Sequence, residues 1–342
     1  MWRLLPATTG LFLAFAASGV AAPQPQKRDP RRAQRAVEQG LRLESSGRLD
    51  QAVGYYDEAL RYDPGNAAAW RQRGRLHLSL GRLNEAVRDL TEAVRLTPGD
   101  AEAWAARGDA YYRLEQPEMA SLDYTRAIDL KLERAALYNS RAAANARLGR
   151  HEKAIEDYSQ GIRLRLDSPE PYKSRGDSLV ALGRFRDAIE DYDSALKLKP
   201  DFVDAWVERG FAWGQTGQFA RAIEDFDTAL RLNPKNAHAY ALRGGARFEM
   251  GEVELAVKDF TAALDLGSQD VRVLLARGAA YARLGRLEDS LKDRDAAVAA
   301  APDNAAAYLA RGGVYHLLGH HEKGLEDRTR AIELSPNLAE AW

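Results

Sequence analysis

The chain has 342 residues, of which 29% are charged, and its 49 Lys and Arg are balanced by 50 Asp and Glu. So even a balance excludes a general electrostatic attraction to nucleic acid or to an anionic membrane. The sequence contains no cysteine, which excludes disulfides, thiolate metal sites and cysteine nucleophiles.

The first 22 residues differ from everything that follows them. Arg3 precedes an apolar stretch over residues 11–20, and small residues stand at Gly19, Ala21 and Ala22. This order is typical of a secretory signal peptide, and the stretch is short for a membrane span. We therefore expect residues 1–22 to be a signal peptide, with export to the periplasm or the cell exterior and a mature chain that begins near Ala22. An uncleaved membrane anchor is the alternative.

Residues 23–32 (PQPQKRDPRR) are rich in proline and basic side chains. This composition predicts a flexible linker without secondary structure.

From residue 33 to residue 342 the sequence repeats with a period of 34 residues, without insertions. Nine repeats begin at residues 33, 67, 101, 135, 169, 203, 237, 271 and 305, and a truncated tenth repeat begins at residue 339. Because the chain stops four residues into that repeat, without a polar terminal helix, we interpret the sequence as a piece of a longer protein or a truncated reading frame. The alternative is that the second helix of the ninth repeat tolerates exposure.

Four positions of the repeat carry the pattern. Position 4 is aromatic in seven repeats (Trp70, Trp104, Tyr138, Tyr172, Trp206, Tyr240 and Tyr308), and position 8 is glycine in all but the fourth, which has Ala142. Position 20 is alanine in the first seven repeats, and a proline stands near the end of six. Two runs of helical periodicity, at positions 1–14 and 18–28, are separated by a glycine-containing turn. The small residues predict a close crossing of two antiparallel helices, with the position-4 ring filling the gap where they diverge.

This spacing of Trp or Tyr, Gly, Ala and Pro resembles the tetratricopeptide repeat (TPR) over about nine-tenths of the chain. The resemblance implies an all-α, right-handed superhelical solenoid. In that family the first helices line a concave groove, which commonly receives a peptide or a helix from another protein.

The terminal repeats depart from the pattern. The first repeat has Ala36 at position 4, as expected of an N-terminal cap. Arg294 and Arg328 replace the usual aromatic at position 24 of repeats eight and nine. A charged side chain at a helix seam must extend outward or find a carboxylate, so we expect these repeats to be looser.

Two opposite charges recur in repeats two to nine. Position 7 is arginine (Arg73, Arg107, Arg141, Arg175, Arg209, Arg243, Arg277 and Arg311), and position 23 is aspartate (Asp89, Asp123, Asp157, Asp191, Asp225, Asp259, Asp293 and Asp327). Because equal spacing in every repeat is what architecture requires, we interpret them as structural ion pairs that bind no ligand.

No pattern indicates catalysis. His316 and His320 have i, i+4 spacing, but no third ligand supports a metal site. The glycine pairs at 244–245 and 312–313 fall within expected helices, where they cannot hold phosphate. We therefore expect no enzymatic activity, no cofactor, no metal, no nucleic acid and no small-molecule substrate.

Side chains that vary on the groove face are the candidates for binding a partner. We expect a protein or peptide partner to bind around Val207, Phe211 and Phe248. Lys173, Arg147 and Asn139 flank them on the same face. The alternative is that the two phenylalanines only fill irregularities between adjacent first helices.

The sequence therefore predicts an exported, non-catalytic scaffold, for example in envelope assembly or export machinery. The alternative is the repeat region of a longer sensory or enzymatic protein whose catalytic domain lies beyond residue 342. A structural spacer without a selective groove is a third hypothesis.

Overall fold

A computed structural model describes residues 28–165 and 167–337. Within these residues the chain forms eighteen α-helices and no strand, which confirms the expected all-α fold. The predicted signal peptide, residues 23–27 of the predicted linker and the start of the tenth repeat lie outside the described residues.

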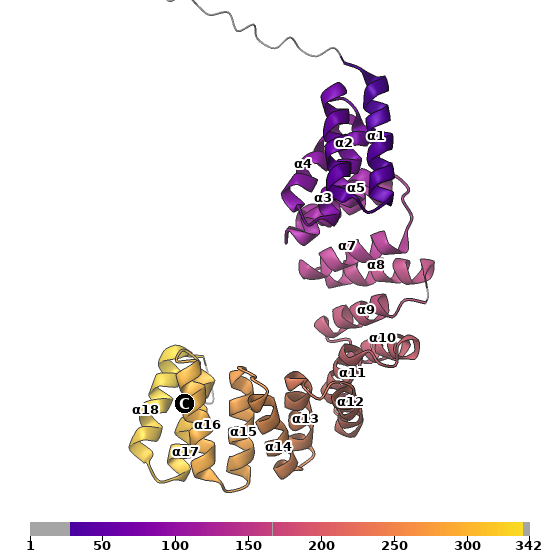
Figure 1. The fold of residues 1–342 in the computed structure, drawn as a ribbon. Helices are drawn as coiled ribbons and strands as arrows, with labels where there is room; N and C mark the ends of the chain where they lie inside the picture. The colour runs from indigo at the N-terminus through magenta and orange to yellow at the C-terminus, as the bar shows by residue number, and fades with distance from the viewer. Residues whose placement is uncertain (1–27, 166, 338–342) are drawn as a thin grey trace, which may run out of the picture. The chain divides into compact units, whose positions relative to one another are not determined.

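The chain divides into an N-terminal part, up to Ala110, and a C-terminal part, from Tyr111. The N-terminal part holds α1 (Pro30–Ser45), α2 (Leu49–Tyr62), α3 (Ala67–Ser79) and α4 (Leu83–Leu96), and α5 (Ala101–Arg113) spans the division. The C-terminal part holds α6 (Pro117–Asp129), α7 (Ala135–Arg147), α8 (His151–Leu164), α9 (Pro169–Ala181), α10 (Phe185–Leu198), α11 (Val203–Gln215), α12 (Phe219–Leu232), α13 (Ala237–Glu249), α14 (Val253–Asp265), α15 (Val271–Arg283), α16 (Leu287–Ala300), α17 (Ala305–Leu317) and α18 (His321–Leu334) (Figure 1).

Each repeat is one pair of helices, and its small residues allow the two helices to approach closely. A Cβ atom added to Gly176 would lie 2.7 Å from Cε1 of Tyr192, and one added to Gly210 would lie 2.7 Å from Cε1 of Phe226. In these two repeats a larger side chain at position 8 would therefore displace the ring at position 24. The alanines at position 20 are fully buried. The crossing predicted from the sequence is confirmed.

The second helices are longer than the periodicity indicates. In repeat two, α4 covers positions 17–30 of the repeat instead of 18–28. The turn before the second helix needs a left-handed residue, and glycine at position 15 supplies it with φ between 69° and 83°. In repeat three this position is Glu115, with φ 58°.

The linker prediction is wrong at its end, because α1 begins at Pro30 and not at residue 33. The Asp29 side chain accepts a hydrogen bond from the Arg32 backbone N–H, and Pro30 occupies the first helical turn, where its missing N–H costs nothing. Arg28 pairs with the nearly buried Asp63 of the first repeat. Basic residues expected in a free linker therefore belong to the first repeat.

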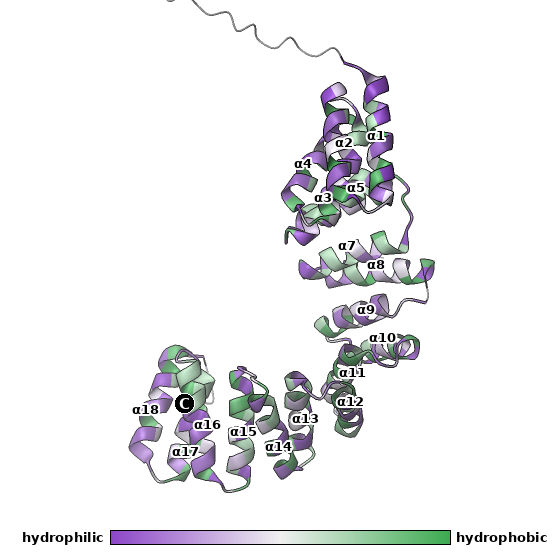
Figure 2. Ribbon diagram, viewed as in Figure 1, coloured by the Kyte–Doolittle hydropathy of each residue, from purple (hydrophilic) through white to green (hydrophobic). Residues whose placement is uncertain are grey.

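Successive pairs stack through both kinds of helix. In the C-terminal part each second helix contacts the next first helix, and the first helices also contact one another in the series α7, α9, α11, α13, α15 and α17. Hydrophobic and hydrophilic residues are mixed along the helices (Figure 2), as expected where neighbours bury one side of a helix and leave the other exposed. The series of first helices forms one continuous surface of this part. Within the described residues, no helix is long and apolar enough to cross a membrane.

Candidate functional site

The arginine at position 7 and the aspartate at position 23 of one repeat form a bidentate ion pair. The arginine Nε and Nη2 donate to the two carboxylate oxygens at 2.6–3.0 Å. These pairs are Arg73–Asp89, Arg141–Asp157, Arg175–Asp191, Arg209–Asp225, Arg243–Asp259, Arg277–Asp293 and Arg311–Asp327. Arg107 and Asp123 belong to different parts of the chain. The sequence left open whether the contact lies within a repeat or across a seam, and these pairs lie within a repeat.

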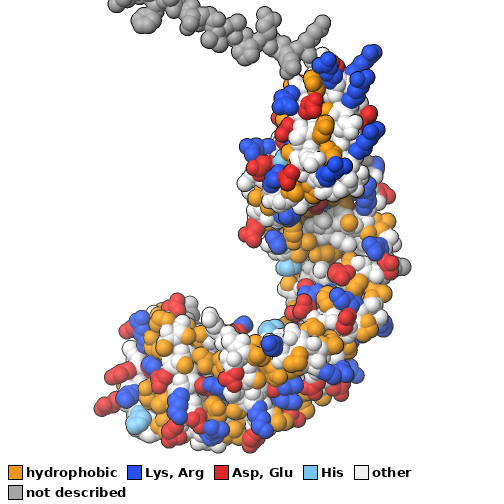
Figure 3. Space-filling view, in the orientation of Figure 1, with side chains coloured by type: hydrophobic (Ala, Val, Ile, Leu, Met, Phe, Trp, Pro, Cys, Tyr) orange, Lys and Arg blue, Asp and Glu red, His pale blue; other side chains and the backbone are white. Residues whose placement is uncertain are grey.

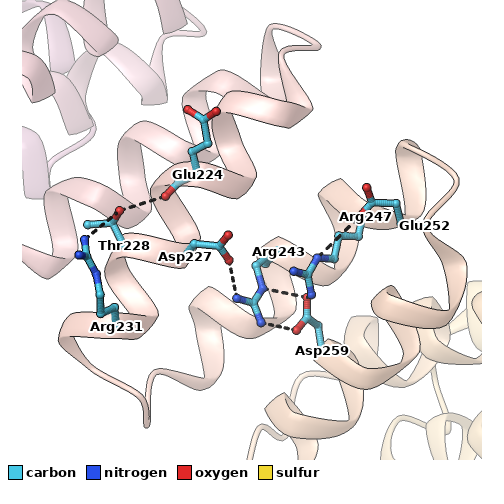
Figure 4. Close-up of polar contacts among 8 residues, drawn as sticks. All are labelled: Glu224, Asp227, Thr228, Arg231, Arg243, Arg247, Glu252 and Asp259. Carbon is cyan, nitrogen blue, oxygen red and sulfur yellow. Dashed lines mark hydrogen bonds and ion pairs between the residues drawn. The ribbon is translucent and has the colours of Figure 1, made fainter.

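The third guanidinium nitrogen bridges to the preceding repeat, a contact that the sequence analysis missed. Nη1 of Arg243 donates to Asp227 on α12 while its other nitrogens hold Asp259 on α14 (Figure 4). Position 25 supplies the acceptor in every described case: Asp57, Thr91, Thr125, Ser159, Asp193, Asp227, Thr261 and Asp295. Each contact therefore joins one repeat to the preceding repeat.

The same guanidinium lies over the position-4 aromatic ring, as a cation–π contact. The distance from Cζ to the ring centroid is 4.6 Å for Arg209 over Trp206 and 5.3 Å for Arg243 over Tyr240. In repeat eight, where Leu274 replaces the aromatic, Arg277 lies over Tyr281 instead. The position-4 tryptophans also donate through Nε1 to the backbone oxygen of the preceding proline, as Trp206 does to Pro200.

Burial explains why this pair needs full hydrogen bonding. The Asp225 side chain is 6% exposed and the Arg209 side chain 17%. Burial raises the pKa of Asp225, and the hydrogen bond and charge of Arg209 oppose that rise. A half-satisfied carboxylate in this place would be costly, so the recurring pair is an architectural element of the repeat.

Position 11 adds a further polar contact to the buried aspartate in three repeats. Nε2 of His77 lies 3.7 Å from Asp89, and Nδ2 of Asn145 donates to Asp157 at 3.4 Å. Arg247 donates to Asp259 at 2.8 Å (Figure 4). Leucine occupies this position in repeats one and five, so the polar residues were a signal that the sequence analysis did not use.

The surface formed by the first helices is hollowed between α11, α13 and α15. A cavity of about 390 Å³ is lined there by apolar groups, with Glu208, His238, Asp270 and Arg272 at its polar edges. The apolar lining comprises Phe211, Ala241, Leu242, Gly245, Phe260, Val273 and Ala276. We refer to this cavity as the first-helix hollow.

A second cavity, of about 200 Å³, extends from the first-helix hollow toward α12. It shares Phe211, Ala241, Leu242 and Gly245 with the hollow and adds Gly214 and Phe219 among its lining residues. A Cβ atom added to Gly214 or Gly245 would have no atom within 4 Å. These two glycines therefore keep space open, whereas Gly244 beside them packs against Phe260.

Phe211 is the one predicted groove residue that lines this space. Its ring is half-buried and meets Phe185 edge to face, with the centroids 6.5 Å apart. Val207 is 3% exposed and packs with Phe226 and Leu230 in the core, so its assignment to the groove is wrong. An apolar β-branched side chain facing the next helix pair is more stable buried than at a wet surface.

The other predicted groove residues have local partners. Phe248 packs at the edge of the core, and Arg283 lies over its ring at 5.2 Å, so it does not face the hollow freely. Lys173 pairs with Asp177 at 2.7 Å on α9. Arg147 is exposed on α7 and lies 4.3 Å over the ring of Tyr112.

Asn139 lies against α8 instead of extending into a groove. Its Oδ1 is buried without a hydrogen-bond partner, and a Cβ atom added to Gly161 would overlap that oxygen. The glycine on α8 therefore makes room for the amide, and the structure gives Asn139 a packing role.

The two arginines at position 24 of the last repeats, Arg294 and Arg328, lie in different surroundings. Arg294 is 8% exposed and donates through Nε to Ser290, which donates in turn to the Gly278 carbonyl. Arg294 therefore follows neither of the two expected courses, to extend outward or to find a carboxylate, because the small Ser290 side chain makes room for it and accepts its hydrogen bond. Arg328 is exposed.

The histidine that contacts His316 is His321, and not His320 with its i, i+4 spacing. Nδ1 of His316 lies 2.9 Å from Nδ1 of His321, whereas His320 lies edge-on to Tyr315. In the described part of the chain, no three His, Asp or Glu side chains are grouped as metal ligands.

A protein-family model, the tetratricopeptide repeat, matches residues 37–101, 72–131, 105–171, 174–237, 214–271 and 243–302. The chain belongs to the tetratricopeptide repeat family. No curated protein sequence matches it significantly.

Several solved structures share the fold at low sequence identity. YrrB, a TPR protein with an unusual peptide-binding site, is 19% identical, with 54% of this chain and 95% of YrrB covered and a TM-score of 0.51. A TPR protein from Parabacteroides merdae is 19% identical, with 73% and 99% covered and a TM-score of 0.52. The Cut9–Hcn1 structure of APC/C is 14% identical, with 93% and 76% covered and a TM-score of 0.56.

TPR membership and the helix-pair architecture together indicate a protein-interaction scaffold whose partners are proteins or peptides. The TPR fold is typically non-catalytic. On such a scaffold the repeated arginine contacts fix the array, and the surface that varies between repeats is free to recognise a partner.

Proposed function

We propose that this TPR chain binds a peptide segment of a partner protein in the first-helix hollow. The supporting observation is an open, mainly apolar cavity of about 390 Å³ that continues into a second of about 200 Å³. Ligand cavities in proteins typically measure about 300–1,000 Å³ and combine apolar walls with a few polar groups. The hollow has this character, with Phe211 and Leu242 beside Glu208 and Arg272.

The variation between repeats supports the choice of this place. Position 9 is Phe211 in repeat six and Gly245 in repeat seven. On these neighbouring first helices, a phenylalanine ring therefore lies beside a position that has no side chain and open space around it. An incoming side chain that fills this space buries apolar area on both sides. That contact favours binding by about 25 cal/mol per Å² before the costs of association are counted.

Filling the hollow tests the proposal. Random twelve-residue peptides displayed on phage are selected on the full chain, and the affinity of the strongest binders is measured by fluorescence anisotropy. The variant Gly245→Leu projects a side chain into the hollow, so we expect it to weaken binding by tenfold or more.

Gly313 provides the matched control, because it occupies the same repeat position on α17 and also has open space around its Cα. Gly313→Leu is expected to bind the peptides as the wild type does, and unfolding midpoints show whether both variants fold. Equal affinities for the two variants, or a library that yields no binder, would contradict the proposal.

We further propose that the protein works outside the cytoplasm, in the assembly or export of envelope components. The apolar stretch at residues 11–20 and the small residues after it support export. N-terminal sequencing of the protein from its producing cell is expected to find a chain that begins near Ala22. A chain that retains Met1 in the cytosol would overturn this part of the proposal.

A further inference from the structure

Glu208 and Asp270 are the two carboxylates that line the first-helix hollow, and Glu208 lies in its α11 wall. It stands on α11 three residues before Phe211, and both side chains line the cavity. Its side chain is partly buried, and within the described residues no hydrogen bond to its carboxylate is present. This partly buried acid therefore borders an apolar space without a hydrogen-bond donor from the described residues.

The neighbouring cation does not neutralise Glu208. Lys173 on α9 is held by Asp177, with Nζ 2.7 Å from Oδ2, and the Tyr192 hydroxyl donates to the other oxygen of Asp177 at 3.0 Å. Asp204, one turn before Glu208 on α11, adds a further negative charge. One lysine therefore faces three carboxylates.

Titration of Glu208 reflects the same imbalance. Burial raises the pKa of its carboxyl, the charges of Asp177 and Asp204 raise it further, and Lys173 opposes them. A cation that entered the hollow would stabilise the ionised carboxylate of Glu208.

The opposite wall contributes little net charge. Asp270 caps the start of α15 and holds Arg272 at 2.7 Å, and His238 is exposed. The apolar part of the hollow is thus bordered by an excess of negative charge on the side of α9 and α11. An acidic ligand would meet repulsion there, whereas a basic one would meet attraction.

We infer that the hollow takes a peptide in which a lysine or arginine stands beside a large apolar side chain. The apolar side chain fills the space over Gly245 against Phe211. The cationic side chain lays its aliphatic stem along the same wall and hydrogen-bonds Glu208 through its charged end. This inference rests on the proposed peptide-binding function and names the class of peptide.

The peptides selected from the random library test the inference directly. Sequences with Lys or Arg next to Trp, Phe or Leu are expected to be enriched. Enrichment of Asp or Glu, or an absence of any charge preference, would overturn it.

A charge-removal variant assigns the effect to Glu208. The strongest selected peptide and its analogue with Gln for the basic residue are measured on the wild type and on Glu208→Gln. We expect the basic peptide to bind the wild type about tenfold more tightly than its Gln analogue, as a charge-assisted hydrogen bond does. In Glu208→Gln this difference is expected to disappear while binding of the Gln analogue stays the same.

Glu249→Gln is the control for net charge, because Glu249 is exposed on α13 and does not line the hollow. It should retain the tenfold preference. A preference that persists in Glu208→Gln would contradict the inference. Loss of binding in Gly245→Leu without any preference for basic peptides would support the proposed function and reject only the peptide class.

Discussion

At the residue scale, the position-7 arginine of repeats two to nine combines contacts that are usually made by several side chains. The Arg209 guanidinium holds Asp225 within its repeat, reaches Asp193 in the preceding repeat and lies over the Trp206 ring. Lysine could not replace it, because a single ammonium cannot bridge two carboxylates in a fork and stack flat on a ring. These contacts of Arg209 thus explain why arginine recurs at position 7.

The two aspartates that contact Arg209 differ in burial. We therefore expect their removal to lower the free energy of unfolding by different amounts. Asp225→Ala removes a bidentate partner that is 6% exposed and is expected to destabilise the chain by about 3–5 kcal/mol. Asp193→Ala removes a partner that is 41% exposed and should cost about 0.2–1 kcal/mol. Chemical denaturation measures the unfolding free energy of both variants. Equal losses of stability would show that the buried pair has no special role.

His77 should make the stability of the N-terminal part depend on pH. Burial lowers the pKa of this histidine, Arg73 and Arg82 lower it further, and Asp89 and Glu85 oppose the change. The unfolded chain therefore takes up a proton more readily, and stability is expected to fall as the pH drops below about 6.5. The slope of unfolding midpoint against pH between pH 8 and pH 5.5 measures this effect. His77→Leu, which places at position 11 the leucine found in repeat five, should flatten the slope. If the slope is unchanged in His77→Leu, titratable groups other than His77 cause the pH dependence.

At the element scale, sequence periodicity predicted the helix pairs because their determinants are local. Gly176 and Ala188 stand at fixed distances in the repeat, and the crossing of α9 and α10 follows from their size. The start of α1 was missed because Asp29 and Pro30, which begin the helix, lie before the first full repeat.

The binding surface was harder to predict from the sequence. The assignment of Phe211 to the groove face agrees with its place in the wall of the hollow, but Val207 is buried against the next helix pair. Repeat position alone does not distinguish a side chain that faces solvent from one that the neighbouring repeat covers. Gly245 was passed over because an absent side chain carries no chemical signal, although its absence is what opens the hollow.

The turn between α5 and α6 contains a correctable strain. Glu115 adopts φ 58° at the position where the other repeats have glycine, and a non-glycine residue pays for this conformation. Glu115→Gly is therefore expected to stabilise the chain by about 1 kcal/mol, less the entropy that glycine gains in the unfolded state. The thermal unfolding midpoint of Glu115→Gly shows whether the change stabilises the chain. The reverse change in repeat four, Gly149→Glu, should destabilise by a similar amount, and a loss of stability in Glu115→Gly would show that the turn is not strained.

At the scale of the whole molecule, stability is the sum of many neighbour contacts. In the C-terminal part successive helix pairs pack against one another, and the separate buried clusters follow one another along the chain. Charged side chains of both signs are interspersed over the visible face of this part (Figure 3), so no single charged region dominates it. An array of this kind holds its surface residues in place locally, and recognition can be confined to a few repeats.

Such an array should respond locally to a local defect. Hydrogen exchange followed by mass spectrometry is expected to show α11 and α12, which are covered on both sides, as better protected than α17 and α18 near the end of the described chain. Asp225→Ala should then raise exchange in α11 and α12, which carry the broken Arg209–Asp225 pair, and in α10, whose Asp193 contacts the same arginine. It should leave α7, α8, α17 and α18 close to their wild-type rates. Asp193→Ala serves as the control, because losing its more exposed contact should change exchange little anywhere. A uniform rise across the C-terminal part would mean that these repeats unfold as one cooperative body, and the stepwise account of their stability would then be wrong.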